Sequence, residues 1–63
     1  MADLREIVME ALSNARDNGE HFIGWTAQEI ADDLMTYDAD LEDADVLAVI
    51  KLVSEWLVSR RRA

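Results

Sequence analysis

Hydrophobic residues recur along the first part of the chain at the spacing of one helix face. The positions that follow the i, i+3, i+4, i+7 pattern are Leu4, Ile7, Val8, Ala11, Leu12 and Ala15. Asp3, with Glu6 three residues later, is typical of a capping box, and Asn18-Gly19 supplies a left-handed residue that commonly ends a helix. We therefore predict a first helix over residues 3–18.

A second helix is predicted after a short connector, residues 19–24. The connector carries two apolar residues between the only two glycines of the chain, so we expect it to enter the core. Thr26 and Glu29 have the spacing of a second capping box, with Trp25 and Ile30 at the positions of a hydrophobic staple. The helix is predicted over residues 26–37. Its expected inward face is Ala27, Ile30, Ala31, Leu34 and Met35.

A third helix is predicted over residues 41–60, after the polar joint of residues 38–40. Asp40 or Asp43 is expected to cap it. Its main apolar stripe consists of Val46, Val49, Ile50, Val53, Trp56 and Leu57. Leu47 and Val58 lie on a different face and Leu52 flanks the stripe, so this helix either sits centrally or offers an interface. The pattern predicts a single all-α domain, residues 1–63, folded as a three-helix bundle.

Composition indicates a folded, strongly acidic domain. The chain has 63 residues, 51% of them hydrophobic, and fourteen acidic against six basic residues give a net charge of −8. It contains no cysteine, so disulfides cannot support its small core, and self-association or a partner is the expected support. No apolar run is long enough to span a membrane, and the N-terminus lacks the order of a signal peptide. We expect a cytoplasmic protein without a membrane partner.

The segment Thr26-Ala27-Gln28-Glu29-Ile30-Ala31-Asp32-Asp33-Leu34 resembles the first helix of a helix-turn-helix unit, as in winged-helix and small antitoxin-type regulators. The resemblance is close over these nine residues and loose over residues 25–58. It implies a helix-turn-helix-like arrangement of the second and third helices. DNA binding is disfavoured, because the helix that would enter the major groove would begin with four carboxylates, and the joint exceeds the usual three or four residues.

Acidic residues are concentrated between positions 29 and 45, where eight acids occur in seventeen positions without a basic residue. Helix caps and solvent-exposed positions account for some of them. Like charges three or four residues apart destabilise a helix, so the excess indicates a surface that meets a positive patch. The predicted partner-binding residues are these eight acids and Tyr37, which we expect to be exposed: Glu29, Asp32, Asp33, Tyr37, Asp38, Asp40, Glu42, Asp43 and Asp45.

In size and charge the chain is similar to small acidic phage-encoded inhibitors that mimic nucleic acid, such as anti-CRISPR and anti-restriction proteins. This resemblance, which is one of composition, implies docking on a basic, nucleic-acid-binding surface of a partner protein and inhibition or regulation of that partner. One alternative is a dimeric helix-turn-helix transcriptional regulator or antitoxin-like protein. In that case Leu47, Leu52 and Val58 pair two chains, and residues 60–62 touch phosphates. A second alternative is a structural subunit of a larger assembly.

Catalytic and metal-binding signatures are weak. A calcium loop starting at Asp38 would place Asp43 where glycine is needed and Val49 where a bidentate glutamate is needed. His21 is the only histidine, and we interpret it as a capping or surface residue. Neither a nucleophile elbow nor a zinc-binding histidine pair is present. We expect no enzyme activity, no cofactor and no metal site.

Overall fold

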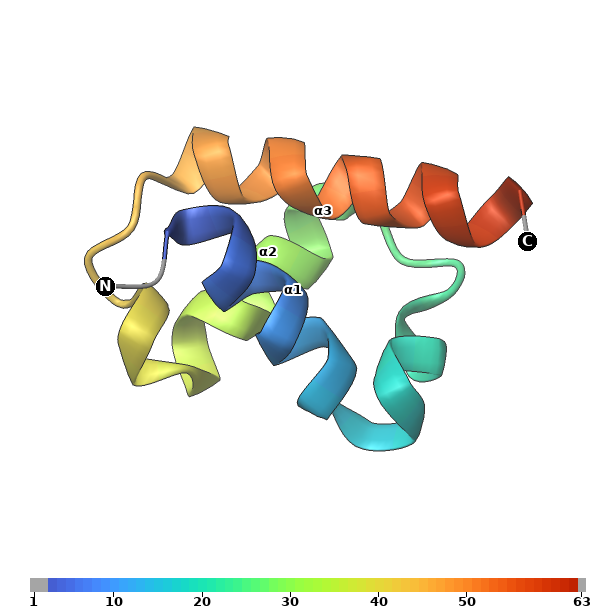
Figure 1. Ribbon diagram of the computed structural model, residues 1–63, viewed down its shortest axis with the longest axis horizontal. Coiled ribbons are helices and arrows are strands. Elements are labelled where there is room, and N and C mark those ends of the chain that lie inside the picture. Colours follow the sequence, from blue (N-terminus) through green and yellow to red (C-terminus); the bar gives the residue numbers. More distant parts are fainter. Residues whose placement is uncertain (1–2, 63) are drawn as a thin grey trace.

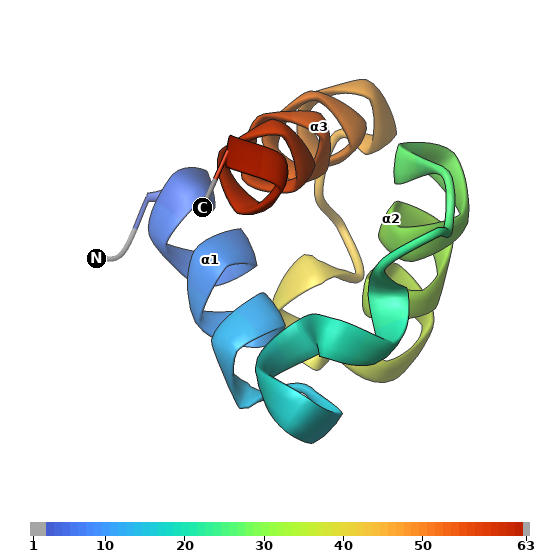
Figure 2. The ribbon, with the colours of Figure 1, turned by 90° about the vertical axis from the view of Figure 1, so that its right-hand side faces the viewer.

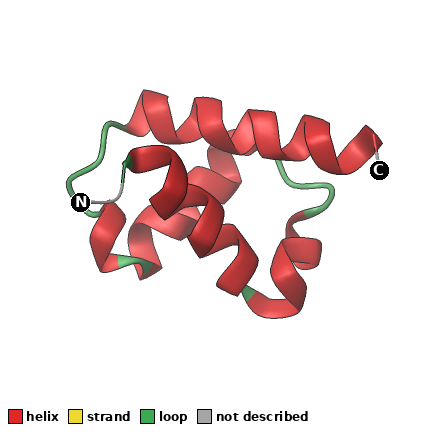
Figure 3. Ribbon diagram, viewed as in Figure 1, coloured by secondary structure: helices red, strands yellow, loops and turns green. Residues whose placement is uncertain are grey.

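The computed structural model describes residues 3–62, with the side chains described as far as Arg60. This part of the chain is all-α, which confirms the predicted fold class (Figure 3). The α-helices are α1 (Leu4–Asn14), α2 (Ala27–Tyr37) and α3 (Val46–Arg62). Two connectors join them, and each contains a short 3₁₀ segment, η1 (Arg16–Phe22) and η2 (Ala39–Leu41).

Helix α3 is the organising element of the bundle. It lies along one edge of the molecule, with α1 and α2 on the same side of it (Figures 1 and 2). Its contact with α2 is the most extensive in the fold, α1 packs on it less extensively, and α1 and α2 contact each other least. The buried core therefore forms where all three helices and both connectors meet. Its members are Val8, Leu12, Phe22, Ile30, Ala31, Leu34, Leu41, Val49, Val53 and Leu57.

Helix α1 ends at Asn14, four residues before the predicted end. Ala15 is extended, and then Asp17, Asn18 and Gly19 all have positive φ, at 57°, 56° and 83°. Asp and Asn are the non-glycine residues that adopt this conformation most readily. The left-handed conformation thus begins two residues before the glycine expected to end the helix, which turns the chain back towards the core.

The first connector enters the core, as predicted, through one of its two apolar residues. Phe22 is 1% exposed, whereas Ile23 is exposed. Gly19 lies directly under the ring of Trp56: a Cβ at this position would be 2.9 Å from Trp56 Cζ2 and 3.0 Å from the carbonyl oxygen of Leu12. Only glycine combines this close approach with the positive φ. The turn therefore fixes where the C-terminal half of α3 packs.

Helix α2 begins and ends close to the predicted positions. Both hydrogen bonds of the capping box form: Glu29 N–H donates to Thr26 Oγ1 at 3.1 Å, and Thr26 N–H donates to Glu29 Oε1 at 3.0 Å. All five residues of the expected inward face are buried or pack against the core. The ring of Trp25, however, packs edge-on against Phe22, with centroids 5.1 Å apart. The staple with Ile30 stays a prediction.

Helix α3 begins at Val46, not near residue 41 as predicted. Asp45 caps it, because its Oδ1 accepts the Leu47 N–H at 3.1 Å, so neither Asp40 nor Asp43 has the expected capping role. Leu41 lies in η2 and is fully buried, although the sequence pattern did not mark it as a core residue. Within the predicted stripe the interior positions are buried or half-buried, while Val46 is exposed.

Among the described residues, two ion pairs link separate elements at the surface. Arg5 Nη2 lies 3.2 Å from Glu55 Oε1 and joins α1 to α3, while Arg60 lies 3.8 Å from Glu20 and 5.3 Å above the Trp56 ring. Exposed pairs of this kind contribute at most about 1 kcal/mol each, so the apolar core dominates stability. The side chains of Arg61 and Arg62, predicted to touch phosphates in one alternative, lie outside the described residues.

Candidate functional site

A groove of about 740 Å³ lies between α1 and α2, the two helices that contact each other least. We call it the α1/α2 groove. Its apolar wall includes Ile7 and Ala11 from α1, Phe22 from the first connector and Leu34 from α2. The same side chains belong to the core or pack against it, so the core supports the wall of the groove. The groove is therefore a partly apolar surface backed by the core.

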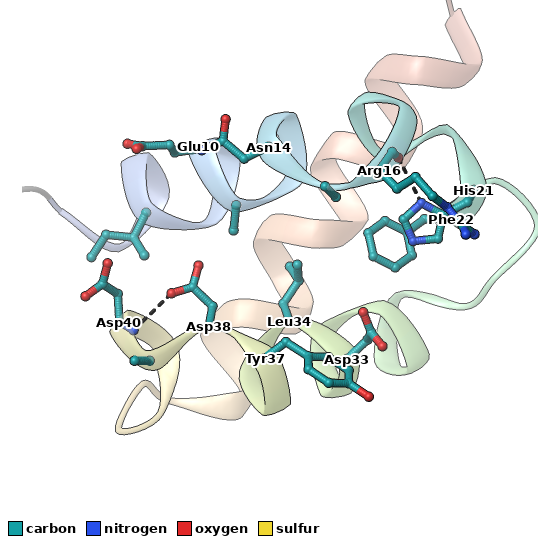
Figure 4. A pocket seen from close by; sticks show the side chains of 14 residues that line it. Glu10, Asn14, Arg16, His21, Phe22, Asp33, Leu34, Tyr37, Asp38 and Asp40 are labelled. Carbon is teal, nitrogen blue, oxygen red and sulfur yellow. Dashed lines mark hydrogen bonds between the residues drawn. The ribbon is translucent and has the colours of Figure 1, made fainter.

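Carboxylates border the α1/α2 groove on both sides (Figure 4). Glu10 projects from α1, Asp33 from α2, and Asp38 and Asp40 come from the second connector. Arg16 is the only permanently cationic side chain in the lining, so acids outnumber bases four to one. Like charges that converge around a concave surface add their fields there and attract cations. Electrostatically, this groove suits a positively charged group.

Tyr37 stands at the border of the groove, in the last turn of α2, and is 82% exposed. On a helical wheel it falls next to Asp33, which is four residues earlier. In Figure 4 both side chains project from the same side of α2. An exposed tyrosine beside carboxylates offers both a flat apolar ring and a hydroxyl to a partner.

The opposite end of the groove is closed by Arg16, His21 and Phe22 (Figure 4). His21 Nδ1 lies 3.0 Å from the carbonyl oxygen of Arg16, a hydrogen bond that requires the proton on Nδ1. The imidazole also lies 4.0 Å from the Phe22 ring, centroid to centroid. His21 therefore helps to hold the first connector in shape.

Two of the predicted partner-binding acids lie on the other side of α2. Glu29 and Asp32, together with Met35, line a smaller groove, of about 420 Å³, shared with Val46 and Ile50 of α3, which we call the α2/α3 groove. Successive helical residues are 100° apart, so Asp32 and Asp33 face different neighbours. The two adjacent aspartates therefore border two different grooves.

The three acids nearest α3 lie apart from both linings. Glu42, Asp43 and Asp45 are exposed in the turn between η2 and α3. The nine predicted partner-binding residues therefore form three sets instead of one face. Asp33, Tyr37, Asp38 and Asp40 gather at the α1/α2 groove, Glu29 and Asp32 at the α2/α3 groove, and Glu42, Asp43 and Asp45 in the turn before α3.

Three of the eight acids have a local structural role. Glu29 accepts the Thr26 N–H, Asp38 Oδ1 accepts the Asp40 N–H at 2.9 Å, and Asp45 caps α3. Such caps stabilise a helix start by about 1 kcal/mol. Among the described residues, the side chains of Asp33 and Asp40 make no comparable bond, so their position at the groove has no such local explanation.

Sequence reasoning missed the part of the groove contributed by α1 and the first connector. Glu10 and Asn14 are one turn apart on the polar side of α1, beside Ile7 and Ala11, and this spacing was the available signal. Arg16 and His21 gave no signal, because their position depends on the left-handed turn at residues 17–19. The groove is thus assembled by tertiary packing.

The residues predicted for self-association are also divided. Leu47 and Val58 are exposed on α3, whereas Leu52 is half-buried and packs against the core. Leu52 therefore belongs to the interior of the bundle.

Among the described residues, no group of three or more His, Asp or Glu side chains is arranged to hold a metal ion. None of the helices in this part of the chain combines the length and the apolar character that crossing a bilayer requires. In comparisons with protein-family models, curated proteins and solved structures, the chain has no significant match.

Proposed function

We propose that this protein is a small acidic binding module that docks on a basic, nucleic-acid-binding surface of a partner protein and inhibits or regulates it. The observation that carries the proposal is the α1/α2 groove, where four carboxylates and an exposed tyrosine surround an apolar wall. Of the nine binding residues expected from the sequence, Asp33, Tyr37, Asp38 and Asp40 line this groove, and the proposal is limited to them. Glu10, which also lines the groove, is added to the set.

The chemistry of the groove defines the segment it accepts. Arginine or lysine side chains suit the carboxylate border, and one apolar side chain between them suits the wall formed by Ala11 and Leu34. Tyr37 can lie flat against an arginine guanidinium, because aromatic faces attract cations. Basic segments of this kind are common on proteins that bind nucleic acid, which supports competition with nucleic acid as the mode of inhibition.

A direct test uses a twelve-residue peptide of repeating Arg-Arg-Leu as the probe. The groove variant carries Glu10→Lys, Asp33→Lys and Asp40→Lys, and the control variant carries Asp32→Lys, Glu42→Lys and Asp43→Lys. Both change the net charge equally, so a difference between them reports position. We expect the groove variant to bind about tenfold more weakly than the control, as expected for three lost pairs at about 0.5 kcal/mol each.

Amide chemical shifts locate the binding site on the wild-type protein. On titration with the peptide, shift changes should concentrate at residues 10–16 and 33–40, and added salt should weaken the binding. Equal affinities for the two variants, or changes spread evenly over the surface, would contradict the proposal. Circular dichroism of both variants checks that the helices remain intact.

The partner itself can be sought by affinity capture with the same three proteins. A partner that uses the groove is retained by the wild type and by the control, and is lost with the groove variant. Filter binding to a pool of DNA at low salt separates this proposal from the helix-turn-helix alternative, because steeply salt-dependent retention of DNA would favour a regulator. The carboxylates of residues 42–45, directly before α3, oppose such retention.

A further inference from the structure

The outer face of α3 carries two large apolar side chains that the bundle leaves uncovered. Leu47 is 76% exposed and Val58 is 53% exposed. They are eleven residues apart, which places them on the same side of the helix and about 16 Å apart along its axis. Lys51 and Ser54 lie between them on this side. α1 and α2 lie on the other side of α3, and no α3 residue lines the α1/α2 groove (Figures 1 and 2).

The two ends of α3 carry opposite charges. Glu42, Asp43 and Asp45 are exposed directly before its first residue. Arg60 lies near its other end and is followed in the sequence by Arg61 and Arg62, so three of the six basic residues of the chain occur here. The most basic segment of this acidic protein thus lies one helix length from one of its most acidic segments.

We propose that two copies of the chain associate through the outer faces of α3, in antiparallel orientation. Charge complementarity selects the occupant and the orientation together: an antiparallel second copy brings acidic ends against basic ends, whereas a parallel copy brings like charges together. A two-fold interface is self-complementary, so each contact occurs twice. The proposal goes beyond the binding function of the α1/α2 groove and is independent of it.

The register follows from the positions of the two exposed apolar residues. If Leu47 of each copy packs on Val58 of the other, the two-fold axis passes between residues 52 and 53. Lys51 then lies opposite Ser54 of the second copy. Arg60 projects to the other side of α3, where it lies over the Trp56 ring and near Glu20, so it does not pair with Asp45 of the second copy. Two Leu–Val contacts make a small interface, so the dimer should form in a concentration-dependent way.

The register can be tested by disulfide formation, because the chain contains no cysteine of its own. Ser54→Cys places two thiols about 4.5 Å apart along the axis, within reach of a disulfide. Leu47→Cys alone places them about 16 Å apart, out of reach, whereas an equimolar mixture of Leu47→Cys and Val58→Cys brings unlike chains together. Ser13→Cys, exposed on α1, measures random collision.

We expect covalent dimers to form at least tenfold faster for Ser54→Cys, and for the mixture, than for Leu47→Cys or Ser13→Cys. Faster cross-linking of Leu47→Cys than of Ser54→Cys would overturn the antiparallel register. Equal rates for all variants would overturn the interface.

Sedimentation equilibrium provides a test without cysteines. Leu47→Asp should raise the dissociation constant of the dimer at least tenfold, while Ile23→Asp, an exposed apolar residue on the first connector, should leave it unchanged. A monomeric wild type at millimolar concentration, or equal effects of the two variants, would overturn the proposal. Failure of peptide binding at the α1/α2 groove would leave these outcomes unaffected.

Discussion

The two connectors both turn the chain between helices, but different interactions stabilise them. Each turns the chain between helices through a short 3₁₀ segment, and each delivers one fully buried apolar side chain to the core, Phe22 from the first and Leu41 from the second. The first is held by left-handed residues and by contacts among the rings of His21, Phe22 and Trp25. The second is held by carboxylates that accept backbone N–H groups, Asp38 at its start and Asp45 at its end.

The comparison of the two connectors shows that some acids of this protein serve the fold, while others line the α1/α2 groove without such a role. An aspartate that accepts a backbone N–H stabilises the turn and also contributes negative charge to the surface. Asp38 does both, because it caps η2 and lines the α1/α2 groove. Asp33 and Glu10 project from helix faces and line the groove without being part of a turn. Stability and binding should therefore respond differently to substitutions in these two groups.

The largest expected effect comes from removing the buried residue of either connector. Phe22→Ala should lower the free energy of unfolding by about 3–5 kcal/mol and Leu41→Ala by about 2–5 kcal/mol, because each leaves a cavity in the core. A domain of this length has a total stability of roughly 3–9 kcal/mol, so either substitution should remove a large part of it.

Urea denaturation followed by circular dichroism measures both effects, and Ile23→Ala on the exposed part of the first connector is the control. If Leu41→Ala cost no more than this control, the second connector would not depend on its buried leucine.

An intermediate effect is expected at the left-handed turn. Gly19→Ala places a side chain at a φ of 83°, which alanine disfavours, and brings its methyl group to 2.9 Å from Trp56 Cζ2. We therefore expect a loss of about 2–3 kcal/mol in the free energy of unfolding. Gly24→Ala has a similar φ of 99° but nothing within 4 Å of the added Cβ, so it should cost only about 1 kcal/mol. Equal losses in thermal or urea denaturation would show that the contact with Trp56 contributes nothing.

The smallest effect is expected at the carboxylate caps. Asp45→Ala removes the acceptor for the Leu47 N–H and should cost about 1 kcal/mol, while Asp43→Ala, two residues earlier and without this bond, should change stability by less than about 0.5 kcal/mol. The pair measures how much of the acidity before α3 serves the fold. A cost at Asp43 as large as at Asp45 would show that general charge near the helix start matters more than the cap.

The parts of the fold that depend on local rules could be predicted from the sequence. The capping box of Thr26 and Glu29 and the apolar positions of α2 fix that helix within one residue of its predicted bounds. The predicted end of α1 was wrong because three consecutive residues after the helix adopt positive φ, and only the third of them is a glycine. The predicted start of α3 was wrong because Leu41 belongs to the separate segment η2. Leu41 is flanked by acids, so the sequence pattern gave no indication that it is buried.

The candidate site was only partly predictable for a related reason. The run of acidic residues identified Asp33, Tyr37, Asp38 and Asp40. Their closeness in the sequence suggested a single face, whereas the helix directs Asp32 and Asp33 to two different grooves. Glu10 comes from α1 and meets these residues only through tertiary packing. Distances between helices are set by the core, and one amphipathic pattern is compatible with several such arrangements.

The contact between Gly19 and Trp56 also gives the protein an intrinsic optical probe. The two tryptophans report on different places: Trp25 packs edge-on against Phe22 in the first connector, and Trp56 lies over Gly19 with the guanidinium of Arg60 on its ring. In a Trp25→Phe background, the emission wavelength of the remaining indole follows the docking of the C-terminal half of α3. Local opening of that helix end can then be distinguished from global unfolding without any added label.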